Sequence, residues 1–397
     1  MDLVGWVIFI VALLFSVMLH EAGHFVTAKK FGMKVTRYFV GFGPTIWSTW
    51  RGETEYGIKA LPVGGFVKIV GMTSLDEVDP EDEPRSFRRH PAWQRIVVLC
   101  AGSFMHFVLA FLLIFGLALG IGIENDNTTQ LGTVTACVAS SSTALANGTC
   151  TAADQPSPAK LAGLRVGDQV KAFDGRPVSN WTQLGDAIRR ARPGSPVTIT
   201  VLRDGQTLTL HTTLATVAGR SGGYLGIAPT VVFSPANPAR AVQYAGSSFG
   251  QVIAGSVKGI AALPGALTKL FSKDRAHTAG GQVVGIVGAA EATGTAVAAN
   301  IGWQFKVSFV LLLIASLNIF VGVFNMLPLL PLDGGHVAVV VWERIRAWFA
   351  RLRGRPDPGL VDMTKLLPVS FSVFAILMLF SVVLILADIV NPVNIAG

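Results

Sequence analysis

Four long apolar stretches divide the chain, at about residues 3–28, 96–123, 305–330 and 367–386. An α-helix rises about 1.5 Å per residue, and the hydrocarbon layer of a bilayer is about 30 Å thick. Each stretch is therefore long enough to cross a membrane as a helix. We predict four transmembrane helices, which place both ends of the chain on the same side.

The segment between the first two spans has the pattern of strands rather than of a simple loop. Residues 35–40 and 56–61 alternate between apolar and polar side chains, and residues 65–70 are rich in β-forming residues. Glycines and prolines punctuate these runs, which is typical of β-hairpins. Such strands either dock against the helices inside the membrane, where protein covers their backbone, or form a small solvated sheet.

The long segment between the second and third spans has two parts. Residues 126–217 predict a small β-rich domain, with a strand and turn at 164–178, a helix at 181–190 and a hairpin around Asp204-Gly205. Residues 218–302 are rich in Gly, Ala and Ser, with a weak helical spacing of apolar residues around 239–271. A helix at the membrane surface and a flexible linker both fit that spacing.

The distribution of charge gives the spans a direction. Charged residues make up only 14% of the chain, and the net charge is +8. An average soluble protein has about 25% charged residues, so an ordinary soluble enzyme is disfavoured. Lys and Arg concentrate in the two short loops, between spans one and two and between spans three and four. By the positive-inside rule both loops are expected in the cytoplasm, and the termini and residues 124–302 outside it. The basic charge is thereby accounted for, and the sequence carries no nucleic-acid-binding motif.

Three cysteines are too few for a disulfide framework. Cys137 and Cys150 lie in the segment expected outside the cytoplasm, where conditions are oxidising. A local disulfide and two unpaired thiols both remain open for this pair. Cys100 lies in the second span and is expected to be a small core residue.

The first span contains the sequence His20-Glu21-Ala22-Gly23-His24. Ionisable residues are costly inside a membrane helix and mark a functional site. Histidines four residues apart lie on one face of a helix, where both can bind zinc, and Glu21 is then placed to act as a general base. The alternative is a hydrogen-bonded His/Glu cluster that packs helices together.

A catalytic zinc ion needs three protein ligands and one open position, so the two histidines require a partner. The third span ends in NMLPLLPLDGGH at residues 325–336, where Asp333 is the one carboxylate. Pro328 and Pro331 end the helix and allow Asp333 to turn back toward the bundle. Asp333 is the predicted third ligand. His336 is a rival ligand, and a helix cap or turn is the structural alternative for Asp333.

These two motifs carry a specific resemblance. With HEAGH at 20–24 and NMLPLLPLDGG at 325–335, the chain resembles the site-2 protease family of intramembrane zinc metalloproteases, in the bacterial group that includes the regulator of sigma-E protease. GFGP at 41–44 and PVGGFV at 62–67 resemble the membrane-associated β region of that family. Residues 157–168 resemble part of a PDZ domain. The resemblance covers most of the chain.

The resemblance implies a role for each matching residue. One zinc ion would be held by His20, His24 and Asp333. Glu21 would be the general base. Asn325 would position the substrate or polarise its carbonyl, and strand addition would involve Gly64, Gly65 and Phe66. The second span departs from the family pattern, because His106 stands where relatives commonly have Asn; it is either a core histidine or a partner of the metal ligands.

We therefore expect a polytopic α-helical membrane protein with four transmembrane helices, a membrane-associated β region and an extracytoplasmic PDZ-like α+β domain. The expected segments are a helix with the HExxH motif (1–32), the β region and a cytoplasmic loop (33–92), a second helix (93–124), the PDZ-like domain (125–217), an amphipathic juxtamembrane region (218–302), a third helix (303–335), a cytoplasmic basic loop (336–366) and a fourth helix with a tail (367–397).

The expected function is hydrolysis of a peptide bond within or near the transmembrane segment of single-span membrane proteins. Such substrates would be trimmed on the outside first, as in regulated intramembrane proteolysis of anti-sigma factors or remnant signal peptides, with the PDZ-like domain as a filter. The expected location is the inner (plasma) membrane, with the lipid bilayer as the other partner. A non-catalytic PDZ scaffold and a metal-transport protein are the alternatives, and Glu21 between the histidines favours hydrolysis over both.

Overall fold

The computed structural model describes residues 3–72, 76–125, 127–138, 150, 154–217, 222–266, 270–271 and 284–391. The chain forms two compact units. One comprises Met1–Leu119 and Asn237–Ala396, and we call it the helical unit. The other comprises Gly120–Ala236, and we call it the small unit.

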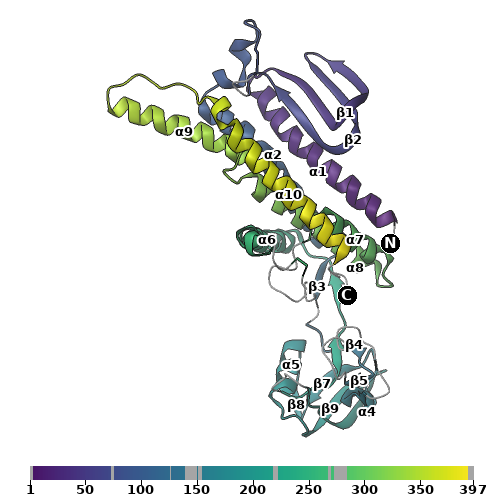
Figure 1. The fold of residues 1–397 in the computed structure, drawn as a ribbon. Helices are drawn as coiled ribbons and strands as arrows, with labels where there is room; N and C mark the ends of the chain where they lie inside the picture. Colours follow the sequence, from purple (N-terminus) through teal and green to yellow (C-terminus); the bar gives the residue numbers. More distant parts are fainter. Residues whose placement is uncertain are drawn as a thin grey trace. The chain divides into compact units, whose positions relative to one another are not determined.

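Four helices of the described chain are long and apolar enough to cross a membrane, as predicted. They are α1 (Leu3–Lys30), α2 (Ala92–Gly120), α8 (Trp303–Asn325), and α10 (Leu367–Val390) together with the short 3-10 helix η5 (Met363–Leu366) that precedes it (Figure 1). The third span ends at Asn325 rather than near residue 330, because the prolines that follow cannot continue a helix. The fourth continues to Val390, beyond the predicted end near residue 386.

The strand pattern after the first span forms a single long hairpin. Strands β1 (Val35–Arg51) and β2 (Thr54–Ile69) pair antiparallel, from Val35 opposite Ile69 to Arg51 opposite Thr54, with several register shifts between. The hairpin lies beside α1 in Figure 1. Two 3-10 turns, η1 (Glu83–Arg85) and η2 (Phe87–Arg89), then lead into α2.

The basic stretch after the third span corrects the prediction, because it is not a loop along its whole length. The first part of this stretch, up to Leu352, belongs to helix α9 (Asp333–Leu352), which begins at the predicted metal ligand. Val340, Glu343 and Ala347 are buried along one side of this helix. Their spacing of three and four residues is that of a helix face, which the concentration of arginines obscured.

Two helices occupy the Gly/Ala/Ser-rich segment, where a helix and a flexible linker were both open. Helix α6 (Pro238–Ala266) packs against α2 and α8 through a cluster of small and apolar residues. Helix α7 (Ile286–Ala298) packs on α1, where the backbones of Gly5 and Gly294 lie in contact. The sequence did not predict α7, because alanine and glycine on all sides give little periodic signal.

The small unit is an α+β structure with a four-stranded sheet in the order β10-β9-β7-β8. These strands are β7 (Gln169–Phe173), β8 (Arg176–Pro177), β9 (Pro196–Arg203) and β10 (Gln206–Thr213). Two helices lie in its described part, α4 (Pro158–Leu161) and α5 (Trp181–Arg190), the latter where the sequence predicted it. The predicted turn at Asp204-Gly205 joins β9 to β10, and both residues have positive φ as a type I′ hairpin requires.

The described residues of the small unit form three further strand pairs, and two of them extend it beyond residue 217. They are β4 (Leu131–Val134) with β11 (Ile227–Pro229), β3 (Ile123–Asn125) with β12 (Val232–Ser234), and β5 (Cys137–Val138) with β6 (Gln155–Pro156). Residues up to Ala236, expected in the juxtamembrane region, therefore belong to this unit. Short strands with non-local partners leave too little pattern in the sequence to reveal this.

The cysteines resolve the choice that the sequence left open. Cys137 and Cys150 form a disulfide, with their Cα atoms 5.9 Å apart. Cys100 is a free, half-buried thiol on α2.

Candidate metal centre

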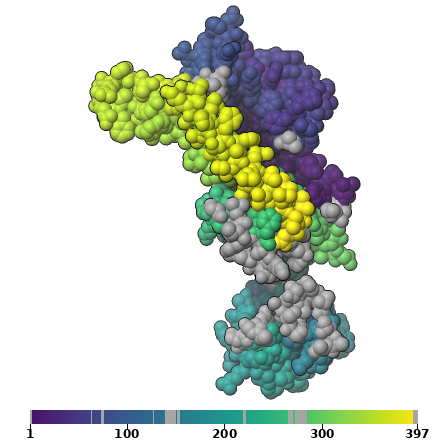
Figure 2. Space-filling view, in the orientation of Figure 1, coloured from purple at the N-terminus to yellow at the C-terminus, as the bar shows by residue number. Residues whose placement is uncertain are grey.

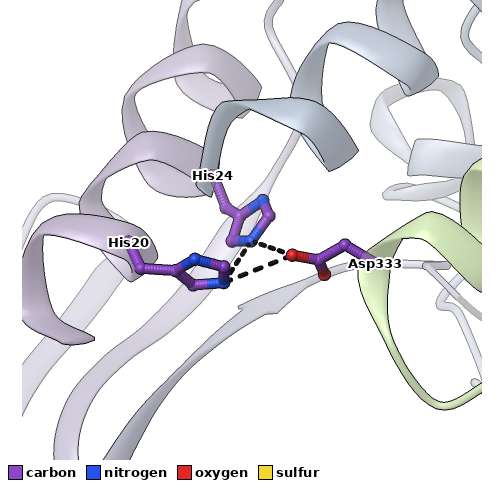
Figure 3. A group of neighbouring side chains, drawn as sticks. All are labelled: His20, His24 and Asp333. Atoms are coloured by element: carbon purple, nitrogen blue, oxygen red, sulfur yellow. Dashed lines mark hydrogen bonds and ion pairs between the residues drawn. The ribbon is translucent and has the colours of Figure 1, made fainter. Parts of the chain in front are cut away.

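Helix α1 brings the two histidines of the first span together. His20 and His24 are one helical turn apart, and both are buried. Their Nε2 atoms lie 3.1 Å from each other (Figure 3). Two imidazole nitrogens at this separation share one small site.

Asp333 reaches the same site from another part of the chain. Its Oδ2 lies 3.3 Å from Nε2 of His20 and 3.4 Å from Nε2 of His24 (Figure 3). Asp333 is the first residue of α9. Its carboxylate is turned toward the two histidines (Figure 3).

The turn between α8 and α9 is packed tightly around this aspartate. A side chain at Gly334 would overlap the backbone carbonyls of Met326 and Leu327, and one at Gly335 would overlap the backbone at Leu329 and Leu330. The double glycine after Asp333 thus lets the start of α9 fold back onto the preceding turn. This close approach fixes where the carboxylate stands relative to the end of α8.

Helix α2 forms the wall of the site through a glycine. A Cβ atom on Gly102 would lie 2.5 Å from Cε1 of His20 and 2.7 Å from its Nε2, and would also overlap Nε2 of His24. Real Cβ atoms do not make such contacts. The backbone of α2 therefore approaches the imidazoles only because residue 102 has no side chain.

A hydrogen bond sets the orientation of one imidazole. Nδ1 of His24 donates to the carbonyl oxygen of Val98, at 2.7 Å. With the proton on Nδ1, the lone pair of Nε2 faces His20 and Asp333. This is how metal-bound histidines are commonly held by a backbone carbonyl.

The three donor atoms fit a zinc ion. Ligands at about 2.0–2.1 Å around a tetrahedral ion are separated by about 3.3 Å. The separations here are 3.1, 3.3 and 3.4 Å. Within the described residues, Oδ2 of Asp333 is buried without a hydrogen-bond partner, and His20, His24 and Asp333 form the one group of three that could hold a metal ion. A cation between them would satisfy that oxygen and both imidazole lone pairs.

Glu21 and the strand β2 lie side by side next to this centre. A Cβ atom on Gly65 would lie 3.3 Å from Cγ of Glu21, and the backbone amide of Val67 also lies beside the Glu21 carboxylate. The ring of Phe66 stacks on Phe39, with ring centroids 5.6 Å apart. The predicted substrate strand is thus within reach of the predicted general base.

Behind the histidines lies a buried polar network that the sequence did not predict as a unit. Nδ1 of His106 lies 3.0 Å from Oγ of Ser16 and 2.9 Å from Oδ1 of Asn318, and Ser16 also donates to Asn318. The ring centroids of His106 and His20 are 5.0 Å apart. His106 is therefore both buried and a neighbour of the metal centre. Ser16, four residues before His20, and the polar Asn318 inside the third span were the available signals.

The remaining predicted residues lie on the elements that lead to the site. Asn325 is the last residue of α8, eight positions before Asp333. His336, the rival ligand, lies outside the group of three and lines a small cavity of about 40 Å³ together with Arg95 and Glu343.

Known proteins resemble this chain along most of its length. The family model described as peptidase family M50 matches residues 8–355. Zinc metalloprotease Rip1 of Mycolicibacterium smegmatis is 38% identical over 413 residues, which covers 99% of this chain and 98% of the relative. Zinc metalloprotease Rip1 of Mycobacterium tuberculosis is 37% identical over 414 residues, which covers 99% of each chain.

Among solved structures, an HtrA-type protease with a tripeptide matches 23% of this chain and 32% of its own, at 24% identity and a TM-score of 0.15, which is too low to bear on the fold. The family match and the relatives cover α1, α8 and the start of α9, the elements that carry or lead to the candidate ligands. The chain belongs to peptidase family M50, the site-2 proteases, and is an intramembrane zinc metalloprotease.

Proposed function

We propose that His20, His24 and Asp333 hold the zinc ion of this protease and that Glu21 is its general base. The observation that carries the proposal is the convergence of the two Nε2 atoms and Oδ2, which lie 3.1 to 3.4 Å from one another. Zinc in such a site supplies Lewis-acid chemistry, which favours attack of water on a peptide carbonyl. Glu21 takes the proton from the attacking water and delivers it to the leaving amide nitrogen.

We further propose that the substrate is the transmembrane segment of a single-span protein and that it is unwound before cleavage. The amide bonds of a helix are already hydrogen-bonded within it, and strand addition offers the unwound backbone new partners. Support comes from the position of Gly65 against Glu21, which brings Gly64, Gly65 and Phe66 beside the proposed base. Asn325 at the end of α8 is proposed to contact the same segment.

Two substitutions separate zinc binding from catalysis in purified protein with a single-span reporter substrate. Glu21→Gln should retain one zinc per chain and lose cleavage, because the base is removed and the ligands remain. His20→Ala should lose both. His211→Ala, an exposed histidine of the small unit, is the matched control and should lose neither. Cleavage by Glu21→Gln at the wild-type rate, or full zinc content in His20→Ala, would contradict the assignment.

A photo-crosslinking amino acid tests the proposed strand contact. Placed at position 66 in the Glu21→Gln protein, it should trap the reporter substrate. Placed at Phe371, an exposed position of α10, it should not. Equal trapping at both positions, or none at position 66, would exclude β2 as the substrate strand.

We also propose that the small unit is a PDZ-like domain that binds peptide outside the cytoplasm. Support comes from its four-stranded sheet and from a groove of about 420 Å³ between α5 and residues 222–227. Gly185→Trp should fill this groove and weaken binding of a peptide with an apolar C-terminus, whereas Gly185→Ala should leave it intact. Unchanged binding by Gly185→Trp would remove the groove from the proposal.

The proposed topology places the termini and the small unit outside the cytoplasm and the basic segments inside it. The support is the concentration of Lys and Arg, including Lys29 and Lys30 at the end of α1 and the arginines of α9. Cysteines introduced at the two faces of the inner membrane should react with an impermeant thiol reagent only on the outer side. Labelling of a cysteine placed in α9 in intact cells would contradict the proposed topology and indicate the opposite orientation.

A further inference from the structure

Helix α9 carries a row of large apolar side chains that is open on the surface of the described structure. The row consists of Val341, Trp342, Ile345, Trp348, Phe349 and Leu352. Their spacing of one, three and four residues places them on one face of the helix. Trp348 is 55% exposed, although a tryptophan is normally largely covered. Figure 2 shows this segment projecting from the helical unit.

Contacts with the rest of the protein hold the opposite face of α9, so the helix cannot rotate about its axis to bury the apolar row. Nη1 of Arg95 on α2 donates to Oε2 of Glu343 at 2.9 Å, and the backbone amide of Val361 donates to the other carboxylate oxygen at 2.9 Å. Both charged side chains are only 10% exposed. A rotation of α9 would leave a buried charge without its partner, which is strongly unfavourable.

Arginines border the apolar row. Arg344 and Arg351 are exposed and lie seven residues apart, and hence on the same side of the helix. Arg346 lies toward the other border, where it donates to the carbonyls of Pro358 and Gly359. The acidic residues of α9, Asp333 and Glu343, both face other groups of the protein. The outward-facing charge of α9 is therefore positive.

We propose that α9 lies in the interfacial layer of the bilayer, with its apolar row in the acyl-chain region, and that Arg344 and Arg351 bind anionic lipid headgroups. A helix with a wide apolar face, a basic border and tryptophans on the apolar side is typical of that layer. The partner is an anionic lipid surface, because the outward-facing charge of the helix is positive.

The connections of α9 to two membrane spans keep this helix close to the membrane surface, where anionic lipid headgroups lie. It follows the membrane span α8 after a turn of seven residues and precedes the span α10, so both of its ends are tied to membrane helices. Glu343, Arg344 and Arg346 in its middle exclude it from crossing the hydrocarbon, and it is not among the four spans. The interface is the remaining layer in which both its apolar and its basic side chains are satisfied.

The position of the helix can be tested with the full chain in nanodiscs whose lipids carry bromine at known depths. The difference in tryptophan emission between wild type and Trp342→Phe/Trp348→Phe isolates the two indoles of α9. That emission should be quenched most by bromines near the headgroup end of the acyl chains. Absence of quenching at any depth would overturn the proposal.

The lipid preference is tested separately with spin-labelled phosphatidylglycerol and phosphatidylcholine. Arg344→Gln and Arg351→Gln should each lower the preference for phosphatidylglycerol by up to about fivefold, in variants that keep their zinc. Arg189→Gln/Arg190→Gln on α5 replaces two exposed arginines of the small unit and should leave the preference unchanged. An unchanged preference in the α9 variants would overturn the proposal. So would a dimer in nanodiscs that Trp348→Ser dissociates, because the apolar row would then be covered by a second copy.

Discussion

At the scale of single residues, the metal centre depends on one missing side chain as much as on the three donors. The donors were predictable from the sequence, because HExxH spacing on a helix and a lone carboxylate after a proline break are local signals. Gly102, Ser16 and Asn318 were not, because their importance arises only when α1, α2 and α8 pack together. Ser16 lies one helical turn before His20, but no spacing in the sequence links Gly102 or Asn318 to that histidine.

Gly102→Ala should abolish or strongly weaken zinc binding, because the added methyl group would occupy the space of both imidazoles. The measurement is the zinc content and zinc affinity of the purified protein. Gly116→Ala is the matched control, since it lies on the same helix with open space around it, and should retain zinc. Helix propensity favours alanine at both positions by up to about 1 kcal/mol, so unfolding of α2 would not explain a loss at residue 102 alone. Wild-type zinc affinity in Gly102→Ala would show that the wall of the site is not where we place it.

Glu53, in the turn between β1 and β2, ties the hairpin to its surroundings through charge. Hydrogen bonds from Arg85, supported by Lys29, lower the pKa of its carboxyl from 4.5 to about 2. A carboxyl with a lowered pKa in the folded state stabilises it fully above pH 4.5, and this contribution is lost as the pH falls toward about 2.

The gap in thermal stability between wild type and Glu53→Gln should therefore be greatest above pH 4.5 and close toward pH 2. Added salt should narrow it, because the carboxylate is partly exposed to solvent. Unfolding temperatures in detergent across this pH range provide the measurement. A gap that stays constant with pH would mean that the charge of Glu53 contributes nothing.

At the scale of elements, the sequence predicted what is locally periodic and missed what is held by distant partners. The four spans, helix α5 and the β9–β10 hairpin follow from runs, spacing and turn residues. Helix α7 does not, because its beginning is set by another element: Oδ2 of Asp388 on α10 accepts from the backbone amides of Gly285, at 2.8 Å, and Gly288, at 2.9 Å. The N-terminus of α7 is thus capped from α10.

Asp388→Ala should destabilise the helical unit by about 1–3 kcal/mol, because two amides at the start of α7, one buried and one partly buried, lose a charged acceptor. Asp388→Asn keeps a side-chain oxygen and should cost less. Denaturant unfolding of the purified protein, followed by the emission of its tryptophans, gives the difference. Equal stability of Asp388→Ala and wild type, or equal loss in both variants, would argue against capping as the role of this residue.

At the scale of the whole molecule, the proposed zinc ion joins parts of the chain that lie near its two ends in sequence. His20 and His24 belong to α1, and Asp333 opens α9. The ion would therefore stabilise the packing of α1 against α9 in the helical unit, in addition to its role in catalysis. Composition and charge predicted a membrane protein of four spans, but not which spans meet, since helices of similar apolar composition give no pairing signal.

Removal of zinc by a chelator should lower the unfolding temperature of the wild type. A ligand present at a thousand times its dissociation constant stabilises the folded state by about 4 kcal/mol. The protein with Glu21→Gln should respond as the wild type does, whereas His20→Ala should start from the lower temperature and show no response. A chelator response in His20→Ala would place the stabilising metal elsewhere in the molecule.

Asp333 lies at one end of α9, so any tilt of this helix about a fixed point in its middle would displace the Asp333 carboxylate. The anchor of α9, the pair of Arg95 and Glu343, lies ten residues from the aspartate, a distance of about 15 Å along a helix axis. A tilt of about 4° around this pivot moves the carboxylate by about 1 Å. Zinc–ligand distances are kept within about 0.2 Å, so the Arg95–Glu343 pair and the close packing of Gly334 and Gly335 at the two points along α9 would together hold the carboxylate within the tolerance of a metal site.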